Sequence, residues 1–403
     1  MTADIQDLDH FVEPEHGGFA GEKRYARALA PYDKFMQDEG LPVIREIGIR
    51  DLRDVELADW ARTGGRGSFI QLLGTEELWG MYVIEIPPGG ALTPEHHLYE
   101  EVFYVVSGRG STEVWLNDEK KKATFEWRAG SLFAVPLNSW HRLVNASRSP
   151  ALVLVATTAP SLMNHFRNTD FIFGSDYQFT ERYSHDPEFF QFKDTIYRGP
   201  TDGRAMMVTN LVPDVVNAAL PLDNQRSPGY RRVETYLASN TFYTWVGEHE
   251  PGKYSKAHYH PPSPILVCLR GEGYTYTWPR QYGTQPFADG TADKVQRQEY
   301  VPGGMVAAAP GGGDWFHQHF GISTEPLRFL YFGGLIRYGA FNPGVRPGEK
   351  KASANLNLEE GGNSIGYHQE DPYFREEFER LLGANGGKSI MPESLYTRNP
   401  AAE

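Results

Sequence analysis

The chain carries one pattern of glycine and histidine residues twice, in the same order and at a constant offset. Unrelated segments would rarely keep a single register over several marker residues, so this pattern indicates an internal duplication. The marker pairs, each 163 positions apart, are Gly89 and Gly252, His97 and His260, and Gly108 and Gly271.

A second pair of segments follows the first at a larger offset. Gly130 and Gly304 are 174 positions apart, and so are Pro136 and Pro310. The difference between 174 and 163 gives the second unit 11 more residues between its two segments. We expect these extra residues in the polar stretch 278–298.

Runs of β-branched and aromatic residues continue from both histidine segments. Residues 101–115 form such a run, broken at a Gly-Arg-Gly turn, and residues 265–276 repeat the plan around a Gly-Glu-Gly turn. Each run is typical of a β-hairpin. Short strands separated by Gly and Pro favour an all-β fold of two barrels or sandwiches over alternating β and α units.

These residues match two family signatures, G-x5-H-x-H-x3-E-x6-G and G-x5-P-x-G-x2-H-x3-N, over residues 80–145 and 247–321. The chain therefore resembles the cupin superfamily, and a bicupin in particular. The resemblance implies two cupin barrels (double-stranded β-helix or jelly-roll), with short helical extensions at both ends. It also implies a homodimer or larger homo-oligomer.

The duplication divides the chain into five expected parts. They are an N-terminal extension with a helix (1–65), a first cupin domain (66–160), a connector packed between the barrels (161–240), a second cupin domain (241–340) and a C-terminal extension with a helix (341–403).

Each extension contains a stretch typical of an amphipathic helix. Residues 23–38 place apolar side chains at helical intervals. Asp371 followed by Pro372 forms a suitable helix start, and the apolar stripe behind it ends at Gly383. We expect these helices to dock on a barrel or on another subunit.

Composition excludes several classes of partner. A formal net charge of −13 argues against nucleic acid or anionic membranes. No apolar run approaches the roughly 20 residues of a membrane-spanning helix, and residues 1–21 lack a signal-peptide core, so we expect a cytoplasmic protein. The single Cys268 lies in an apolar run and is expected to be a buried core thiol, not a thiolate metal ligand.

The histidines of the second unit predict a metal site. His258 and His260 are two positions apart, so on one strand both side chains lie on the same barrel face. His317 or His319 can supply a third imidazole from the opposite hairpin. The sequence Asp-Trp-Phe-His-Gln-His resembles the W-x-W-H-x-H segment of gentisate and salicylate ring-cleaving dioxygenases, which implies His317 as the ligand and His319 as the runner-up.

Pro264 replaces the carboxylate of the usual cupin site and leaves three neutral ligands. Imidazoles accept Fe(II), Mn(II), Zn(II), Ni(II) and Cu(II), and the resemblance favours Fe(II) with open positions for O₂ and a chelating anion. We therefore expect a dioxygenase of a small organic acid or phenolic substrate. Weaker candidates for substrate binding are Arg270, Trp315 and Tyr276.

The first unit differs at its first ligand position, where Glu95 stands in place of histidine. Together with His97, Glu101 and His141 it could hold a second cation, and carboxylate-rich sets favour Mn or Mg. In the alternative interpretation Glu95 pairs with a nearby arginine and this barrel is a scaffold.

Two other functions stay open at this point. One is a Mn- or Zn-dependent bicupin lyase, decarboxylase or isomerase that resembles oxalate decarboxylase and works without O₂. The other is a ligand-binding bicupin without turnover, in which the histidines are remnants of an ancestral site.

Overall fold

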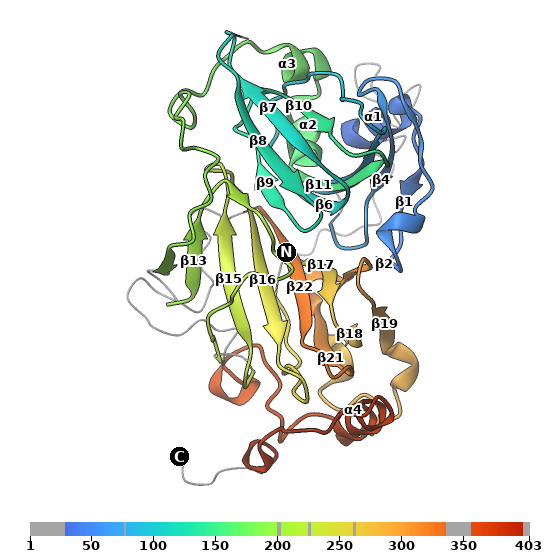
Figure 1. The fold of residues 1–403 in the computed structure, drawn as a ribbon. Coiled ribbons are helices and arrows are strands. Elements are labelled where there is room, and N and C mark those ends of the chain that lie inside the picture. Colours follow the sequence, from blue (N-terminus) through green and yellow to red (C-terminus); the bar gives the residue numbers. More distant parts are fainter. Residues whose placement is uncertain are drawn as a thin grey trace, which may run out of the picture.

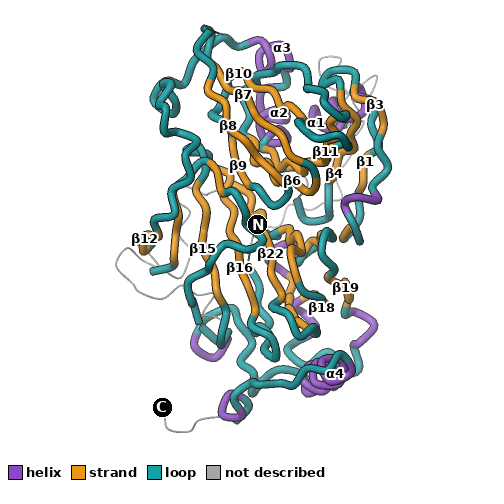
Figure 2. Tube along the Cα trace, viewed as in Figure 1, coloured by secondary structure: helices purple, strands orange, loops and turns teal. Residues whose placement is uncertain are grey.

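The computed structural model describes residues 29–75, 78–118, 120–199, 203–224, 227–260, 263–335 and 356–397. The strands form two units, one above the other in Figure 1, with the helix near the C-terminus at the far end of the second unit. Figure 2 shows that strands dominate both units and that loops join most of them.

The first unit has a large and a small sheet. Its large sheet has the order β1-β4-β5-β11-β6-β9-β14, with β3 paired to β4, and its small sheet has the order β10-β7-β8. Their bounds are β1 (Val43–Ile44), β3 (Ala58–Trp60), β4 (Gly65–Ile70), β5 (Gly80–Ile86), β6 (Glu101–Ser107), β7 (Arg109–Trp115), β8 (Ala123–Arg128), β9 (Leu132–Ala134), β10 (Trp140–Asn145), β11 (Ala151–Thr157) and β14 (Leu211–Val212).

The second unit has the same two-sheet design. Its large sheet has the order β12-β13-β15-β16-β22-β17-β20-β2, and its small sheet has the order β19-β18-β21. Their bounds are β2 (Gly48–Ile49), β12 (Ile196–Arg198), β13 (Ala205–Val208), β15 (Arg231–Tyr236), β16 (Phe242–His249), β17 (Ile265–Arg270), β18 (Gly273–Pro279), β19 (Gln296–Tyr300), β20 (Met305–Ala307), β21 (Trp315–Gly321) and β22 (Leu327–Leu335).

The strand orders of the two units correspond. The series β4-β5-β11-β6-β9 of the first unit matches β15-β16-β22-β17-β20 of the second, and β10-β7-β8 matches β21-β18-β19. The predicted all-β fold of two cupin-like units is confirmed. The connection from β18 to β19 is longer than that from β7 to β8, which places the extra residues of the second unit there.

Each unit also contributes a strand to the other. β14, from the segment between the barrels, pairs with β9 through Leu211 and Phe133. β2, from the N-terminal segment, pairs with β20 through Gly48 and Val306. The sheet of the second unit also includes β15, which lies before the expected domain start at residue 241.

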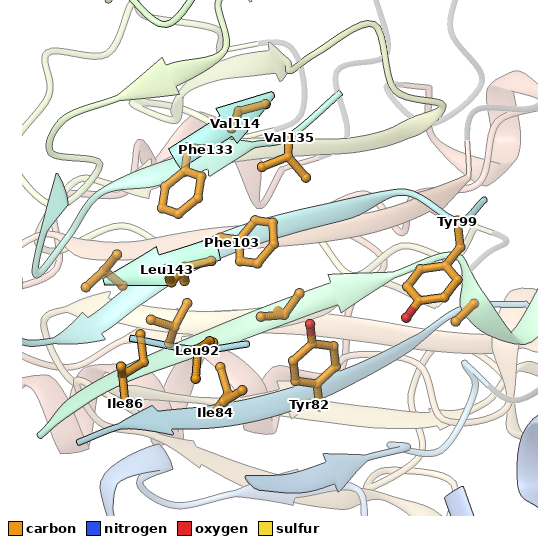
Figure 3. Close-up of a cluster of buried hydrophobic side chains, with 14 of the residues drawn as sticks. Tyr82, Ile84, Ile86, Leu92, Tyr99, Phe103, Val114, Phe133, Val135 and Leu143 are labelled. Atoms are coloured by element: carbon orange, nitrogen blue, oxygen red, sulfur yellow. The ribbon is translucent and has the colours of Figure 1, made fainter. Parts of the chain in front are cut away.

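The large sheets are buried on both faces. Figure 3 shows Phe103 and Phe133 among the side chains that fill the interior of the first barrel. The alternating residues Val102 and Leu132 belong instead to a cluster that includes Ile265 and other residues of the second unit. A strand that is buried on both faces usually has a continuous apolar sequence. All seven residues of β11 are buried, and the first six of them are apolar.

Four α-helices flank the sheets within the described residues. They are α1 (Pro31–Glu39), α2 (Ala159–Phe166), α3 (Thr169–Gly174) and α4 (Pro372–Ala384). The first expected helix begins at Pro31, and residues 23–28 of that prediction lie outside the described part of the chain. None of the described helices is long and apolar enough to cross a membrane.

The C-terminal helix begins as the sequence predicts. The Asp371 side chain accepts a hydrogen bond of 3.0 Å from the Tyr373 backbone N–H. Phe374 and Phe378 are buried in a cluster with aromatic residues of β18 and β21, so α4 covers the outer face of the small sheet. The helix ends at Ala384, one residue after the predicted Gly383.

Candidate metal centres

The second barrel brings three histidines together. One ring nitrogen from each of His258, His260 and His317 lies within 4.8 Å of the others. The ring centroids of His258 and His317 are 4.2 Å apart, and those of His260 and His317 are 5.0 Å apart. His258 and His317 are buried, and His260 is half-buried.

Backbone pairing on two sides fixes this cluster. His258 and His317 exchange backbone hydrogen bonds of 3.0 and 2.9 Å. On its other side, the histidine-bearing segment pairs with the C-terminal segment, where the Tyr259 N–H donates to the Asn363 carbonyl at 3.1 Å. His258 Nδ1 lies 2.9 Å from the carbonyl of Lys256, so Nδ1 carries the proton and Nε2 remains a lone-pair donor for a cation.

His319 lies beside this cluster and is not one of its three members. It follows His317 by two positions on β21, so both side chains lie on the inner face of the strand. Its Nδ1 is 2.8 Å from the Tyr300 hydroxyl, which holds the ring deeper among buried residues.

A small cavity of about 20 Å³ borders the three histidines. This is room for about one water molecule. Pro264, which stands in the place of the usual carboxylate ligand, is part of the wall. The lining residues are Ser227, Tyr230, Trp245, His249, Ser255, His258, His260, Pro264, His317, His319 and Tyr331.

The three weaker substrate-binding candidates lie elsewhere. Arg270 donates a hydrogen bond of 2.8 Å to Glu248. Tyr276 alternates with the inward Thr275 and Thr277, which pair with the histidine strand, so its ring lies on the outer face. Its ring centroid is 5.5 Å from that of Phe374 in α4.

Trp315 packs against the preceding loop, where a side chain at Gly311 would collide with its indole ring. None of Arg270, Trp315 and Tyr276 lines the cavity beside the histidines.

The first barrel also assembles three candidate ligands. His97, Glu101 and His141 each offer an atom within 4.8 Å of the others, and all three are buried. His97 Nε2 is 3.3 Å and His141 Nε2 is 3.8 Å from Glu101 Oε2.

In both histidines Nδ1 donates a hydrogen bond to a backbone carbonyl, and Nε2 is left with its lone pair, as in histidines that bind metals. His97 Nδ1 faces the Tyr99 carbonyl at 2.9 Å, and His141 Nδ1 faces the Ser139 carbonyl at 3.1 Å. Tyr82 donates a 2.7 Å hydrogen bond to Glu101 Oε1. Both Nε2 atoms and Glu101 Oε2 are buried without a hydrogen-bond partner among the described residues, an arrangement that a divalent cation would satisfy.

Burial governs the protonation of these groups. It lowers the pKa of His97 to about 4 and also lowers the pKa of His141, so both imidazoles are neutral near pH 7. Burial raises the pKa of the Glu101 carboxyl. Burial therefore leaves both imidazoles neutral and makes the charged form of the carboxyl unfavourable. These protonation states are compatible with a cation site, because a bound cation would stabilise the carboxylate.

Glu95 is not a member of this cluster. Its carboxylate is ion-paired with Arg62, which also donates a 3.1 Å hydrogen bond from Nε to Glu39. The backbone of Glu95 pairs with that of His141, but the Glu95 side chain points to Arg62. Three of the four residues predicted for this site thus lie together, and Glu95 forms the ion pair with an arginine that the alternative interpretation predicts.

Sequence reasoning did not identify Arg62, Tyr82 or Asn363 as parts of these centres. Arg62 lies 33 positions before its partner Glu95, and Asn363 lies 104 positions after its partner Tyr259. No local pattern marks such contacts.

Comparison with known proteins identifies the fold family. Residues 82–157 match the family described as Cupin domain. No curated protein sequence gives a significant match.

Among solved structures, Bacillus subtilis oxalate decarboxylase with its Mn(II) centers is 14% identical, with a TM-score of 0.45 over 73% of this chain and 78% of that chain. The formate complex of Lactobacillus farciminis oxalate decarboxylase is 12% identical, with a TM-score of 0.44 over 72% and 86%. Vicilin from Corylus avellana (hazelnut) is 11% identical, with a TM-score of 0.44 over 72% and 85%.

Likeness of this degree assigns no activity, and the resemblance of the second unit to gentisate-type dioxygenases stays a prediction. The family match covers the part of the first unit from β5 to β11, and the second unit has the corresponding strand order. Residues 82–157 therefore belong to a cupin domain, and the second unit repeats the strand order of the first.

Proposed function

We propose that this chain is a metal-dependent enzyme whose active centre is the three-histidine cluster of the second barrel. The observation that carries the proposal is the convergence of His258, His260 and His317 beside a cavity. A pure scaffold has no need for three imidazoles aimed at one point.

The ligand set favours an anionic substrate. Three neutral imidazoles and Pro264 add no negative charge, so the full charge of a divalent ion would remain for the substrate to neutralise. A bound metal ion would supply Lewis acidity and, if it is redox-active, electron exchange. Carboxylates, phenolates and enolates are the fitting substrate groups.

The cavity walls limit substrate size. Tyr230, Trp245 and Tyr331 surround the histidines and leave about 20 Å³. Because these rings pack closely, a small organic acid fits with less rearrangement than a substituted aromatic ring. Their apolar surfaces would also exclude water from the reacting groups.

The preferred reaction is an oxidation with Fe(II) and O₂, as predicted for a neutral three-histidine centre. A second candidate is a decarboxylase, lyase or isomerase that uses Mn(II). The cluster of His97, Glu101 and His141 favours this second candidate, because a carboxylate ligand suits Mn(II).

Metal analysis of protein purified without O₂ tests the proposal. Wild type is compared with His258→Ala and with Glu101→Gln, and O₂ uptake is measured with a panel of small carboxylic acids. Loss of iron and of O₂ uptake in His258→Ala alone supports the oxygenase. Turnover that persists without O₂ and fails in Glu101→Gln supports the Mn(II) enzyme, and wild type without bound metal contradicts both.

A further inference from the structure

Tyr230 places a hydroxyl group in the cavity beside the three histidines. The residue is 8% exposed and forms part of the cavity wall. A Cβ atom at Gly247 would collide with the Tyr230 hydroxyl, so this oxygen lies against the face of β16 to which a side chain at position 247 would point. Trp245 and His249 share that face by two-residue alternation, and both line the cavity. The hydroxyl is therefore on the cavity side of the strand.

Packing and a tight loop fix the position of Tyr230. Its ring centroid is 4.7 Å from that of His249. Its backbone carbonyl accepts a hydrogen bond of 2.8 Å from the Asp223 N–H. Gly229, with a φ angle of +74°, turns the chain just before it and donates a 2.7 Å hydrogen bond to Asn224 Oδ1. The hydroxyl is thus held in place before a ligand binds, which lowers the entropic cost of binding.

The Tyr230 hydroxyl forms no hydrogen bond with any residue that the structure describes. Buried polar groups are normally paired, so a hydroxyl of this kind on a cavity wall points to a hydrogen-bonding ligand. Other polar groups of the wall have partners within the protein. Ser255 accepts a 3.0 Å hydrogen bond from the His319 backbone N–H, and His319 Nδ1 lies 2.8 Å from the Tyr300 hydroxyl. A ligand in this cavity therefore meets a positioned phenol donor at Tyr230.

The size of the cavity brings this donor and the histidines to the same ligand. A space of about 20 Å³ holds about one water molecule, so a small group inside it touches opposite walls at once. His258 Nε2 keeps a lone pair for a cation, whereas the Tyr230 hydroxyl supplies a proton for a hydrogen bond. A carboxylate suits both walls, because one oxygen can bind the cation while the other accepts the hydrogen bond.

We propose that Tyr230 is a substrate-binding residue of the second barrel. Its hydroxyl donates a hydrogen bond to one oxygen of a small carboxylate whose other oxygen binds the cation at the three histidines. This inference rests on the function proposed above and narrows its substrate class to small carboxylates. A phenolate has a single oxygen for both partners and is the poorer match. Hydrogen bonds to charged acceptors are among the strong ones, so Tyr230 both orients and retains the ligand.

Formate titration of the Co(II)-loaded full chain tests the proposal. Imidazoles bind Co(II), and the visible spectrum of Co(II) changes when an anion coordinates. His258→Ala identifies the part of the spectrum that belongs to the second barrel. Tyr230→Phe keeps the ring and removes only the hydroxyl, so it should weaken formate binding about tenfold or more and leave Co(II) affinity unchanged. A purely structural role of Tyr230 would lower Co(II) affinity as well.

A second variant and a matched control accompany this comparison. Gly247→Ala leaves Tyr230 itself unchanged, but its methyl group displaces the hydroxyl, so formate binding should weaken here too. Tyr274→Phe is the control, because Tyr274 is a buried tyrosine of the same barrel that packs on the outer face of the small sheet. Its formate affinity should stay within about twofold of wild type.

Several results would overturn the proposal. They are formate affinity that is unchanged in Tyr230→Phe, formate binding that survives in His258→Ala, no formate binding to Co(II)-loaded wild type, or equal losses of Co(II) and formate affinity in Tyr230→Phe. If circular dichroism shows that Tyr230→Phe is unfolded, Gly247→Ala decides the matter in the same way. With each of these results, Co(II) binding that depends on His258 would leave the proposed metal centre intact. Wild type that binds no Co(II) at His258 would contradict that centre, and this inference with it.

Discussion

Glu370 is a buried carboxyl whose protonation should control stability above neutral pH. It lies in the C-terminal segment, where the Tyr254 hydroxyl donates to one oxygen and Gln318 Nε2 donates to the other at 2.9 Å. Burial raises the pKa of Glu370 to about 8 from the ordinary 4.5. Between these values the folded chain binds a proton that the unfolded chain releases.

The sign of the effect follows from this difference. Because the native state binds more protons between pH 4.5 and about 8, the free energy of unfolding falls as the pH rises through that window. The contribution of Glu370 to the free energy of unfolding is complete below pH 4.5, and it is lost as the pH rises through the pKa of the folded state. At about 1.4 kcal/mol per pH unit, the total is on the order of 5 kcal/mol.

Glu370→Gln removes this titration and keeps the shape of the protonated acid. The amide oxygen can still accept from Gln318, and the amide nitrogen can donate to the Tyr254 hydroxyl, which lies 3.0 Å from that of Tyr396. We expect the variant to match wild type at pH 5 within about 1 kcal/mol and to exceed it at pH 9 by up to about 5 kcal/mol.

Urea unfolding measured by circular dichroism at pH 5, 7 and 9 gives the comparison. Titrations shared by the two proteins cancel in the difference at each pH, so the difference reports position 370. An equal dependence on pH in both proteins, or a variant that is less stable at pH 9, would refute the reasoning.

Three further predictions concern separate parts of the molecule. Phe378→Ala should lower the free energy of unfolding by about 3–5 kcal/mol in urea titrations, because α4 loses a buried ring, whereas the exposed Glu379→Ala should change it by less than about 1 kcal/mol. Burial raises the pKa of the Cys268 thiol to about 12, so iodoacetamide should modify it at pH 8 only after unfolding, and rapid labelling of the native chain would contradict its burial. Glu101→Gln should reduce Mn(II) affinity in the first barrel by tenfold or more in metal titrations, and unchanged Mn(II) binding would exclude Glu101 as a ligand.

The duplicated markers predict the fold because they occupy positions with strict backbone or side-chain requirements. Gly108 and Gly271 have φ angles of +90° and +76°, so each hairpin turn demands a residue without a side chain. Asp371 and Pro372 predict the start of α4 for a similar local reason. Such requirements are visible in a single sequence.

Contacts between side chains that are distant in the sequence could be predicted only where the register of two paired strands was known. The outward direction of Tyr276 follows from the two-residue alternation of β18 against His317 and His319, once the pairing of the strands is fixed. The partner of Glu95 could not be found in that way. Arg62 reaches it from the turn between β3 and β4, and that contact depends on how the turn packs under α1 and α3.

The two centres share their architecture and differ in charge and access. In the first, Glu101 supplies a carboxylate and all three candidate ligands are buried, whereas in the second Pro264 occupies the corresponding place and His260 is half-buried. A cation in the first centre would be partly neutralised by protein, which favours Mn(II) and weakens its demand for an anionic ligand. A cation in the second would keep its charge for a substrate. We therefore expect the second unit to be the more reactive of the two, because proline replaces the acidic residue there.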